Sequence, residues 1–234
     1  MAEVAIHIIK VKNSEEGLKV CKNLLYENVS KTSVLFLSGG LTPKLLYEEL
    51  SKEQKLSVGA VALVDERYGE KLHKNSNEKM IRNTGLISYI ENHARFYPVL
   101  ENKDIEDSAK DYDETVRFLF NYFQKSIGIL GIGTDGHTAG IPARTQNSKV
   151  KSQNETDLIT SFNDFPGEFK ERITLTFLGI SKLDLIIVLV FGKEKKKALT
   201  KIFKRGSIEE IPARFLFQKE IAKKTILITN LQLQ

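Results

Sequence analysis

The sequence predicts an α/β fold in which a doubly wound, mostly parallel β-sheet carries helices on both faces. Short runs rich in valine, leucine and isoleucine alternate along the chain with longer segments of helical pattern, which is typical of βαβ units. The run Leu185–Phe191 is apolar without alternation, as expected of a strand covered on both faces. No internal repeat and no glycine-, serine- or proline-rich linker divides the chain, so we expect one domain over residues 1–234.

The expected strands are the short apolar runs. In chain order they are Val4–Ile9, Ser33–Leu37, Gly59–Val64, Ser126–Gly131, Leu158–Ser161, Ile173–Thr176, Leu185–Phe191 and Thr225–Thr229.

The expected helices are the longer segments between these runs. They are Ser14–Asn28, Thr42–Ser51, Ser76–Thr84, Ile105–Phe123 and Lys193–Phe203. The fourth has the clearest period of about 3.6 residues. One stripe of it carries Ala109, Tyr112, Val116, Leu119 and Phe123. The polar stretch Arg144–Asp157 is expected to be an exposed loop.

Composition narrows the class of protein. Hydrophobic residues make up 41% of the 234 and charged residues 28%, which is ordinary for a globular chain with a sizeable core. The single cysteine, Cys21, excludes an internal disulfide and a cysteine-based zinc site, and favours a reducing compartment. There is no secretory signal pattern, and the longest apolar run is too short to span a bilayer. We therefore expect a soluble, cytoplasmic protein without a membrane partner.

The charge balance favours a small anionic ligand over a nucleic acid. Thirty-five basic residues face thirty acidic ones, for a net charge of +5. The only dense basic block is Lys193–Lys197, and no recognisable nucleic-acid module accompanies it. Two or three well-placed cations suffice for a small anion.

In open parallel sheets the ligand lies beyond the carboxyl ends of the strands, so the segments that follow strands matter most. The first runs from Ser38 through Gly39 and Gly40 into a helix, with Thr42 expected as N-cap and Pro43 at the first helical position. Glycines and free N–H groups at a helix start suit a phosphate. A plain, well-capped turn explains the same residues.

The second segment places Asp65, Glu66 and Arg67 directly after a strand. Burying such a cluster is costly unless its charges pair or touch a ligand. A salt bridge at the rim of the sheet is the alternative. Ser76 and Asn77 are expected to cap the next helix.

The third segment follows the strand that ends at Gly131. Its glycines fit the dinucleotide pattern only weakly, because that pattern does not explain Asp135 and His137. A histidine near an acid that orients it is a candidate general base. A structural loop histidine is the alternative.

Together these segments resemble the successive motifs of the 6-phosphogluconolactonases and, less closely, the glucosamine-6-phosphate deaminases. The matching motifs are Ser38-Gly39-Gly40-Leu41-Thr42-Pro43, Asp65-Glu66-Arg67 with Ser76-Asn77, Gly131 to Ala139, Arg172-Ile173-Thr174-Leu175-Thr176, and Gly192-Lys193-Glu194-Lys195. The resemblance covers about residues 5–230 and implies a Rossmann-like fold of the NagB/RpiA type. It implies hydrolysis of 6-phospho-D-glucono-1,5-lactone to 6-phosphogluconate in the oxidative pentose phosphate pathway, without cofactor or metal.

The resemblance also implies roles for nine residues. His137 would be the general base that activates water, with Asp135 orienting it. Arg67 would stabilise the oxyanion or bind a sugar hydroxyl, and Asp65 completes the catalytic group. The phosphate would be held by Gly39, Gly40, Thr42, Arg172 and Lys195. The expected partner is the sugar-phosphate lactone, bound by a monomer or a weak homodimer.

The chain departs from the family pattern in two places. After Ala139 the lactonases usually continue with Ser-Leu-Phe-Pro, whereas here a segment one residue shorter, Gly140-Ile141-Pro142, follows. The end Leu227–Asn230 lacks the aromatic and acidic residues that the family often shows. Both departures concern pocket shape more than catalysis.

Two alternatives remain at this stage. A deaminase would need a base at Asp65 and, in that family, a glutamate where this chain has Pro142. It would also tend to have an aromatic residue in place of Arg67. A non-catalytic sugar-phosphate sensor of this fold would carry a DNA-binding helix-turn-helix, for which the predicted elements leave no room.

Overall fold

The computed structural model contains two β-sheets with helices packed around them, and it describes residues 6–143 and 155–232. The larger sheet has seven strands, all paired in parallel. In spatial order they are β1 (His7–Lys10), β10 (Thr225–Thr229), β9 (Leu185–Val190), β6 (Lys125–Gly131), β2 (Ser33–Leu37), β3 (Ala60–Leu63) and β5 (Arg95–Phe96). The predicted mostly parallel, doubly wound sheet is confirmed.

A smaller antiparallel sheet has the order β4 (Asp65–Arg67), β8 (Arg172–Leu175) and β7 (Ile159–Phe162). The runs that we expected near residues 158–161 and 173–176 are therefore strands, but they lie outside the parallel sheet. The physical reason is the charged segment after β3. Only Val64 separates β3 from β4, and its carbonyl accepts from the Leu175 backbone N–H, 2.9 Å away, which ties the small sheet to the end of β3.

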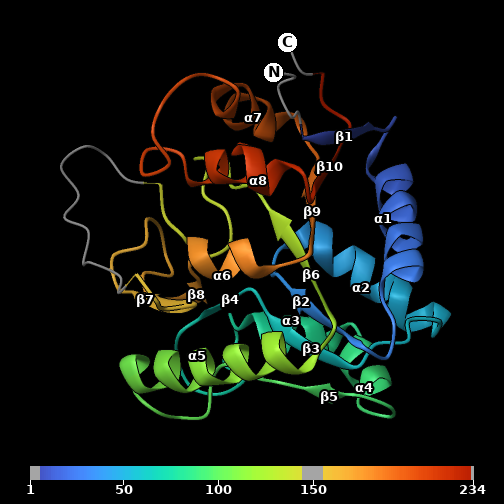
Figure 1. Cartoon of the computed structure of the whole chain (residues 1–234), viewed down its shortest axis with the longest axis vertical. Helices are drawn as coiled ribbons and strands as arrows, with labels where there is room; N and C mark the ends of the chain where they lie inside the picture. The colour runs from blue at the N-terminus through green and yellow to red at the C-terminus, as the bar shows by residue number, and fades with distance from the viewer. Residues whose placement is uncertain (1–5, 144–154, 233–234) are drawn as a thin grey trace.

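Helices cover both faces of the large sheet. Figure 1 shows α1 and α2 on one side of it and α6 and α8 on the other, with α5 against the small sheet. The helices are α1 (Ser14–Asn28), α2 (Leu41–Glu53), α3 (Asn77–Asn83), α4 (Leu86–Ile90), α5 (Ile105–Tyr122), α6 (Phe177–Lys182), α7 (Lys196–Ile202) and α8 (Lys219–Ala222). Two 3₁₀ turns, η1 (Lys193–Lys195) and η2 (Pro212–Phe217), complete the set in the part of the chain that the structure describes.

The predicted long elements agree with the structure within a few residues. The stripe of α5 is buried at Ala109, Tyr112, Val116 and Leu119, as its period predicts, while Phe123 follows the helix. The first two residues of the expected strand Val4–Ile9, and most of the expected loop Arg144–Asp157, lie outside the described residues.

The start of α2 differs from the prediction. The N-cap is Gly40 and not Thr42, and Pro43 is the third helical residue. Gly40 has a φ of 109°, a conformation that favours glycine, so the chain turns into the helix two residues earlier than a threonine cap would allow. Thr42 is thereby placed inside the first turn, where its hydroxyl is free of a capping role.

The core lies on both faces of the central strands. Every residue of β2 and β3 is buried, as are Leu18, Cys21 and Leu25 on the inner face of α1. None of the helices in residues 6–143 and 155–232 is long and apolar enough to cross a membrane.

Candidate active site

A cavity of about 430 Å³ opens at the carboxyl ends of β2, β6 and β9, beside the small sheet. It contains eight of the nine residues that the sequence singles out: Gly39, Gly40, Thr42, Asp65, Arg67, His137, Arg172 and Lys195. The ninth, Asp135, is hydrogen-bonded to His137. Segments separated by more than a hundred residues thus meet at one edge, where an open parallel sheet is expected to bind its ligand.

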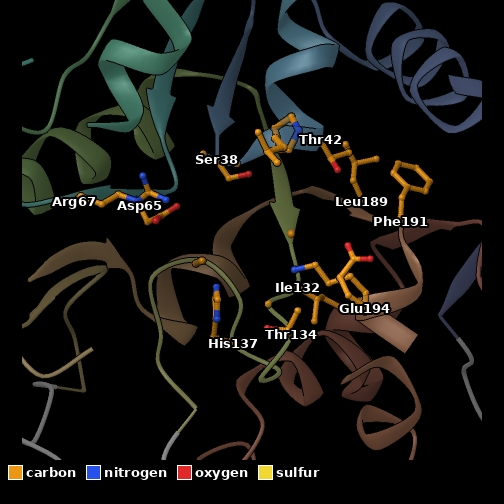
Figure 2. A pocket seen from close by; sticks show the side chains of 18 of the residues that line it. Ser38, Thr42, Asp65, Arg67, Ile132, Thr134, His137, Leu189, Phe191 and Glu194 are labelled. Carbon is orange, nitrogen blue, oxygen red and sulfur yellow. The ribbon is translucent and has the colours of Figure 1, made fainter. Parts of the chain in front are cut away.

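His137 and Asp135 form a close pair on the loop after β6. The Nδ1 atom of His137 lies 2.6 Å from Oδ1 of Asp135. Because a carboxylate accepts, Nδ1 donates, and in the neutral ring Nε2 is the nitrogen with a free lone pair. Figure 2 shows the imidazole rising into the cavity towards Asp65 and Arg67.

The charge of Asp135 is maintained by its partner. Partial burial raises the pKa of this carboxyl, but the hydrogen bonds and the charge of His137 outweigh burial and lower the pKa to about 2. Asp135 is therefore ionised over the whole range in which an imidazole ordinarily titrates. It is able to hold the ring in one tautomer and to stabilise an imidazolium.

Backbone contacts fix the His137 loop. The N–H of Gly133 donates to the carbonyl of His137 at 2.8 Å, and Gly136 turns the chain with a φ of 96°. The N–H of Gly140 donates to Oγ1 of the buried Thr174 at 2.9 Å, which links the loop to β8. The base candidate is therefore held by both sheets.

Two arginines face each other across the small sheet. Arg67 and Arg172 are direct partners in the antiparallel pairing of β4 with β8. Like charges at such positions repel, and the nearest carboxylate, Asp65, has its Oδ2 3.9 Å from Nη1 of Arg172. Burial lowers the pKa of Arg172, while Asp65 acts against that shift. This wall of the cavity carries excess positive charge, which favours an anionic ligand.

The position of Glu66 differs from the prediction that Asp65, Glu66 and Arg67 lie together at the rim of the sheet. Alternation along β4 turns it away from Asp65 and Arg67, so only one of the two predicted rim carboxylates lines the cavity. Its buried carboxylate accepts from the backbone N–H groups of Arg67, Asn77 and Glu78 at 2.6–2.8 Å. Ser76 caps α3 as predicted, by accepting from the Lys79 N–H. Glu66 thus ties β4 to the start of α3.

Glu66 is expected to give the protein a pH-dependent stability. Burial raises its pKa from 4.5 to about 7, against the three N–H donors that favour ionisation. The folded state therefore binds the Glu66 proton more tightly than the unfolded state does. Protonation of Glu66 stabilises the fold fully below pH 4.5, and this stabilisation is lost as the pH rises through about 7. The free energy of unfolding of the wild type minus that of Glu66→Gln should fall by about 1–3 kcal/mol between about pH 5 and pH 8. Urea denaturation at several pH values measures it, and a pH-independent difference would contradict the assignment.

The glycine turn after β2 approaches α3 very closely. A Cβ at Gly39 would lie 1.9 Å from Oδ1 of Asn77, so only glycine fits there. Asn77 in turn donates from Nδ2 to the Asp65 carbonyl at 2.9 Å. Prediction from the sequence treated Asn77 only as a cap residue. The signal in the sequence is that Asn77 closely follows the charged segment Asp65–Arg67, which would have indicated a role in holding that segment in place.

Lys195 and Ser38 also line the cavity. Lys195 follows β9 on η1, and half-burial lowers the pKa of its ammonium group. No carboxylate of residues 6–143 or 155–232 lies within 4.0 Å of Nζ. The Oγ of Ser38, buried just after β2, has no hydrogen-bond partner among the residues that the structure describes. Sequence analysis assigned Ser38 no role, although it directly precedes the two glycines.

The site includes no cluster typical of a metal centre within the described ranges 6–143 and 155–232. No group of three or more histidine, cysteine, aspartate or glutamate side chains comes together there.

Comparison with known proteins places the chain in a family. A family model described as glucosamine-6-phosphate isomerases/6-phosphogluconolactonase matches residues 16–227. A 6-phosphogluconolactonase of Thermotoga maritima is 31% identical over 213 residues, 88% of each chain. The solved 6-phosphogluconolactonase of Trypanosoma cruzi superposes with a TM-score of 0.76 at 24% identity, covering 97% of this chain and 95% of that one. The chain belongs to the glucosamine-6-phosphate isomerase/6-phosphogluconolactonase family.

The fold alone does not separate the two activities named in that family. A monomeric glucosamine-6-phosphate deaminase of known structure also superposes, with a TM-score of 0.73 at 20% identity over 96% of this chain and 97% of that one. The residues of the site must therefore carry the functional argument.

Proposed function

We propose that the protein hydrolyses 6-phospho-D-glucono-1,5-lactone to 6-phosphogluconate, the second step of the oxidative pentose phosphate pathway. The observation that carries the proposal is the Asp135–His137 pair, 2.6 Å apart, facing a cavity wall with excess positive charge. The 6-phosphogluconolactonases among its relatives support the choice of substrate. The side chains present supply the acid, base and cations that this reaction needs, and no cofactor takes part in it.

The proposed chemistry is general-base addition of water. Nε2 of His137 takes a proton from water while the oxygen adds to the lactone carbonyl carbon, and the carbonyl electrons move to the oxygen. The oxyanion then collapses, the bond to the ring oxygen breaks, and the imidazolium returns its proton to that oxygen. Arg67 is assigned to the oxyanion, because it faces His137 across the cavity (Figure 2).

The remaining residues are assigned to binding. The start of α2 offers the N–H groups of the turn at Gly39 and Gly40 and the hydroxyl of Thr42 to the phosphate. Arg172 and Lys195 supply two cations for charge-assisted hydrogen bonds.

Asp65 is assigned to a supporting role on the arginine wall. Its carboxylate lies between the Asn77 amide, 3.4 Å away, and the Arg172 guanidinium, 3.9 Å away. There it offsets part of the repulsion between Arg67 and Arg172.

A spectroscopic assay tests the proposal against the deaminase alternative. Freshly prepared 6-phosphogluconolactone should be hydrolysed faster than in the buffer blank, and glucosamine 6-phosphate should release no ammonia. The reverse result would establish the deaminase. Pro142, which stands where the deaminases carry a glutamate, favours the first outcome.

Replacing Lys195 should separate phosphate binding from catalysis. Lys195→Ala is expected to raise KM for the phosphorylated lactone about tenfold or more, because a charge-assisted hydrogen bond contributes about 1.5–3 kcal/mol. Activity on unphosphorylated gluconolactone should change little. Lys196→Ala and Lys197→Ala are matched controls, since both side chains are exposed outside the cavity. An equal loss on both substrates would assign Lys195 to stability or chemistry instead.

We further propose that the protein works in the cytoplasm as a single domain, as a monomer or weak homodimer. The family model spans residues 16–227 without division, which supports one domain. Light scattering on purified protein over a range of concentrations measures the oligomeric state.

A further inference from the structure

A short hairpin between β7 and β8 brings two aromatic rings against the site. It spans residues 163–171 and is closed by the Phe165 N–H, which donates to the Lys170 carbonyl at 2.9 Å. Phe165 is only 5% exposed, although the residues beside it are exposed. Neither Phe165 nor Phe169 lines the cavity. A large ring buried at the tip of an exposed hairpin has a specific packing partner, and here the partners are site residues.

Phe165 contacts two site residues that come from different sheets. The guanidinium carbon of Arg172 lies 4.4 Å from the centre of the Phe165 ring. The His137 imidazole meets the same ring at 79°, with 5.2 Å between the ring centres. One buried side chain therefore connects the candidate base with a candidate phosphate ligand.

The contact with Arg172 has a consequence for binding. A guanidinium held by an aromatic face is attracted to the ring quadrupole without using its N–H donors. Nε of Arg172 already donates to the Phe169 carbonyl at 3.1 Å, so the backbone of the same hairpin fixes the other side of the group. Within residues 6–143 and 155–232 the Nη atoms of Arg172 make no hydrogen bond, and the Oδ2 atom of Asp65 lies 3.9 Å from Nη1, so the Nη donors can bind an anion. A carboxylate in place of the ring would occupy them.

The contact with His137 restricts the ring of the base. Asp135 holds Nδ1, but a single hydrogen bond leaves the imidazole free to rock about it. The edge-to-face contact with Phe165 limits that motion, because such ring pairs prefer a defined angle. Nε2 is then kept in a fixed direction relative to the bound lactone.

We propose that Phe165 is a positioning residue that keeps the side chains of His137 and Arg172 in a fixed position relative to each other. The base and the phosphate-binding cation can then contact the same substrate molecule. This inference rests on the lactonase function proposed above. Phe165 acts through these two side chains and does not touch substrate. The hairpin thereby couples proton transfer at one end of the substrate to phosphate recognition at the other.

Two kinds of substitution at Phe165 test the proposal: one removes the aromatic ring but keeps an apolar side chain, and the other keeps the ring. Phe165→Leu removes the ring and is expected to lower kcat about tenfold and to raise KM for the phosphorylated lactone about threefold to tenfold. Phe165→Tyr keeps the ring and should restore both values to within about twofold of the wild type. Phe215→Leu is the matched control, because Phe215 is similarly buried and packs against Phe177 away from the cavity. It should change neither parameter.

Two measurements do not depend on activity. The carbon-bound ring protons of His137, assigned from the loss of their NMR signals in His137→Asn, should shift in Phe165→Leu and stay in place in Phe215→Leu. Calorimetry with inorganic phosphate should show weaker binding to Phe165→Leu only. If Phe165→Leu fails to fold, Phe165→Met fills the same space without a ring and is expected to give the same results.

The outcomes distinguish the two proposals. If Phe165→Leu matches Phe215→Leu in kcat, KM and NMR shifts, Phe165 is a core residue and the positioning role is wrong. If the wild type lacks lactonase activity, the proposed function fails, and the NMR shifts with the phosphate titration still decide whether Phe165 orders the site.

Discussion

Replacing His137 with asparagine is expected to lower kcat for lactone hydrolysis by about two to four orders of magnitude, the usual effect of removing a general base. Asparagine is nearly isosteric with the near part of the imidazole and retains a donor towards Asp135, so the loop should keep its conformation. KM should change little, because the phosphate contacts come from other elements. Steady-state kinetics at neutral pH measures both parameters.

The controls for this variant concern the loop and not the base. Its thermal unfolding should stay within a few degrees of the wild type, since the side chain of His137 is partly exposed and contacts Asp135 and Phe165 on the site surface. Asp135→Asn should cause a smaller loss of kcat than His137→Asn, because it removes the orienting carboxylate and leaves the base. Near-normal kcat in His137→Asn would show that His137 is structural, and the proposed mechanism would be withdrawn.

The large sheet was predictable because its strands obey strong local rules. β2 and β10 agree with the sequence prediction residue for residue, since runs that are buried on both faces contain almost only apolar or β-branched residues. The small sheet was not predictable in the same way. β4 has three residues, all charged, and becomes a strand only because β8 pairs with it. Tertiary pairing decides such a segment, and local propensity does not.

The candidate site was largely predictable for a geometric reason. The motifs follow parallel strands, and parallel strands end at one edge, so residues far apart in sequence were expected to meet. The orientation of each side chain was not available from this rule. Glu66 faces away from the cavity because β4 is a strand that the sequence did not indicate. A role for Phe165 was not predicted for a related reason: its hairpin joins two strands that were expected in another sheet.

Gly133→Ala is expected to reduce kcat nearly as strongly as loss of the base, by about a hundredfold. A Cβ at residue 133 would lie 2.1 Å from both Nδ1 and Cε1 of His137 and 2.5 Å from Oδ1 of Asp135. Contacts this short are not tolerated, so the imidazole or the carboxylate must move and their hydrogen bond must lengthen. A misplacement of about 1 Å in a catalytic group is sufficient for a loss of this size. Steady-state kinetics measures the loss, and calorimetry should show that inorganic phosphate still binds.

A double-mutant cycle identifies the cause of that loss. If Gly133→Ala acts by displacing His137, it should reduce kcat in the wild type and have almost no further effect in His137→Asn, because the group it displaces is already absent. Gly131→Ala is the structural control, since a Cβ there meets no atom of residues 6–143 and 155–232 within 4 Å, and the ring-proton signals of His137 should stay in place in that variant. Additive losses in the cycle would mean that residue 133 affects the cavity independently of the base. Non-additive losses would show that the glycine is required because its backbone leaves room for the imidazole that activates water.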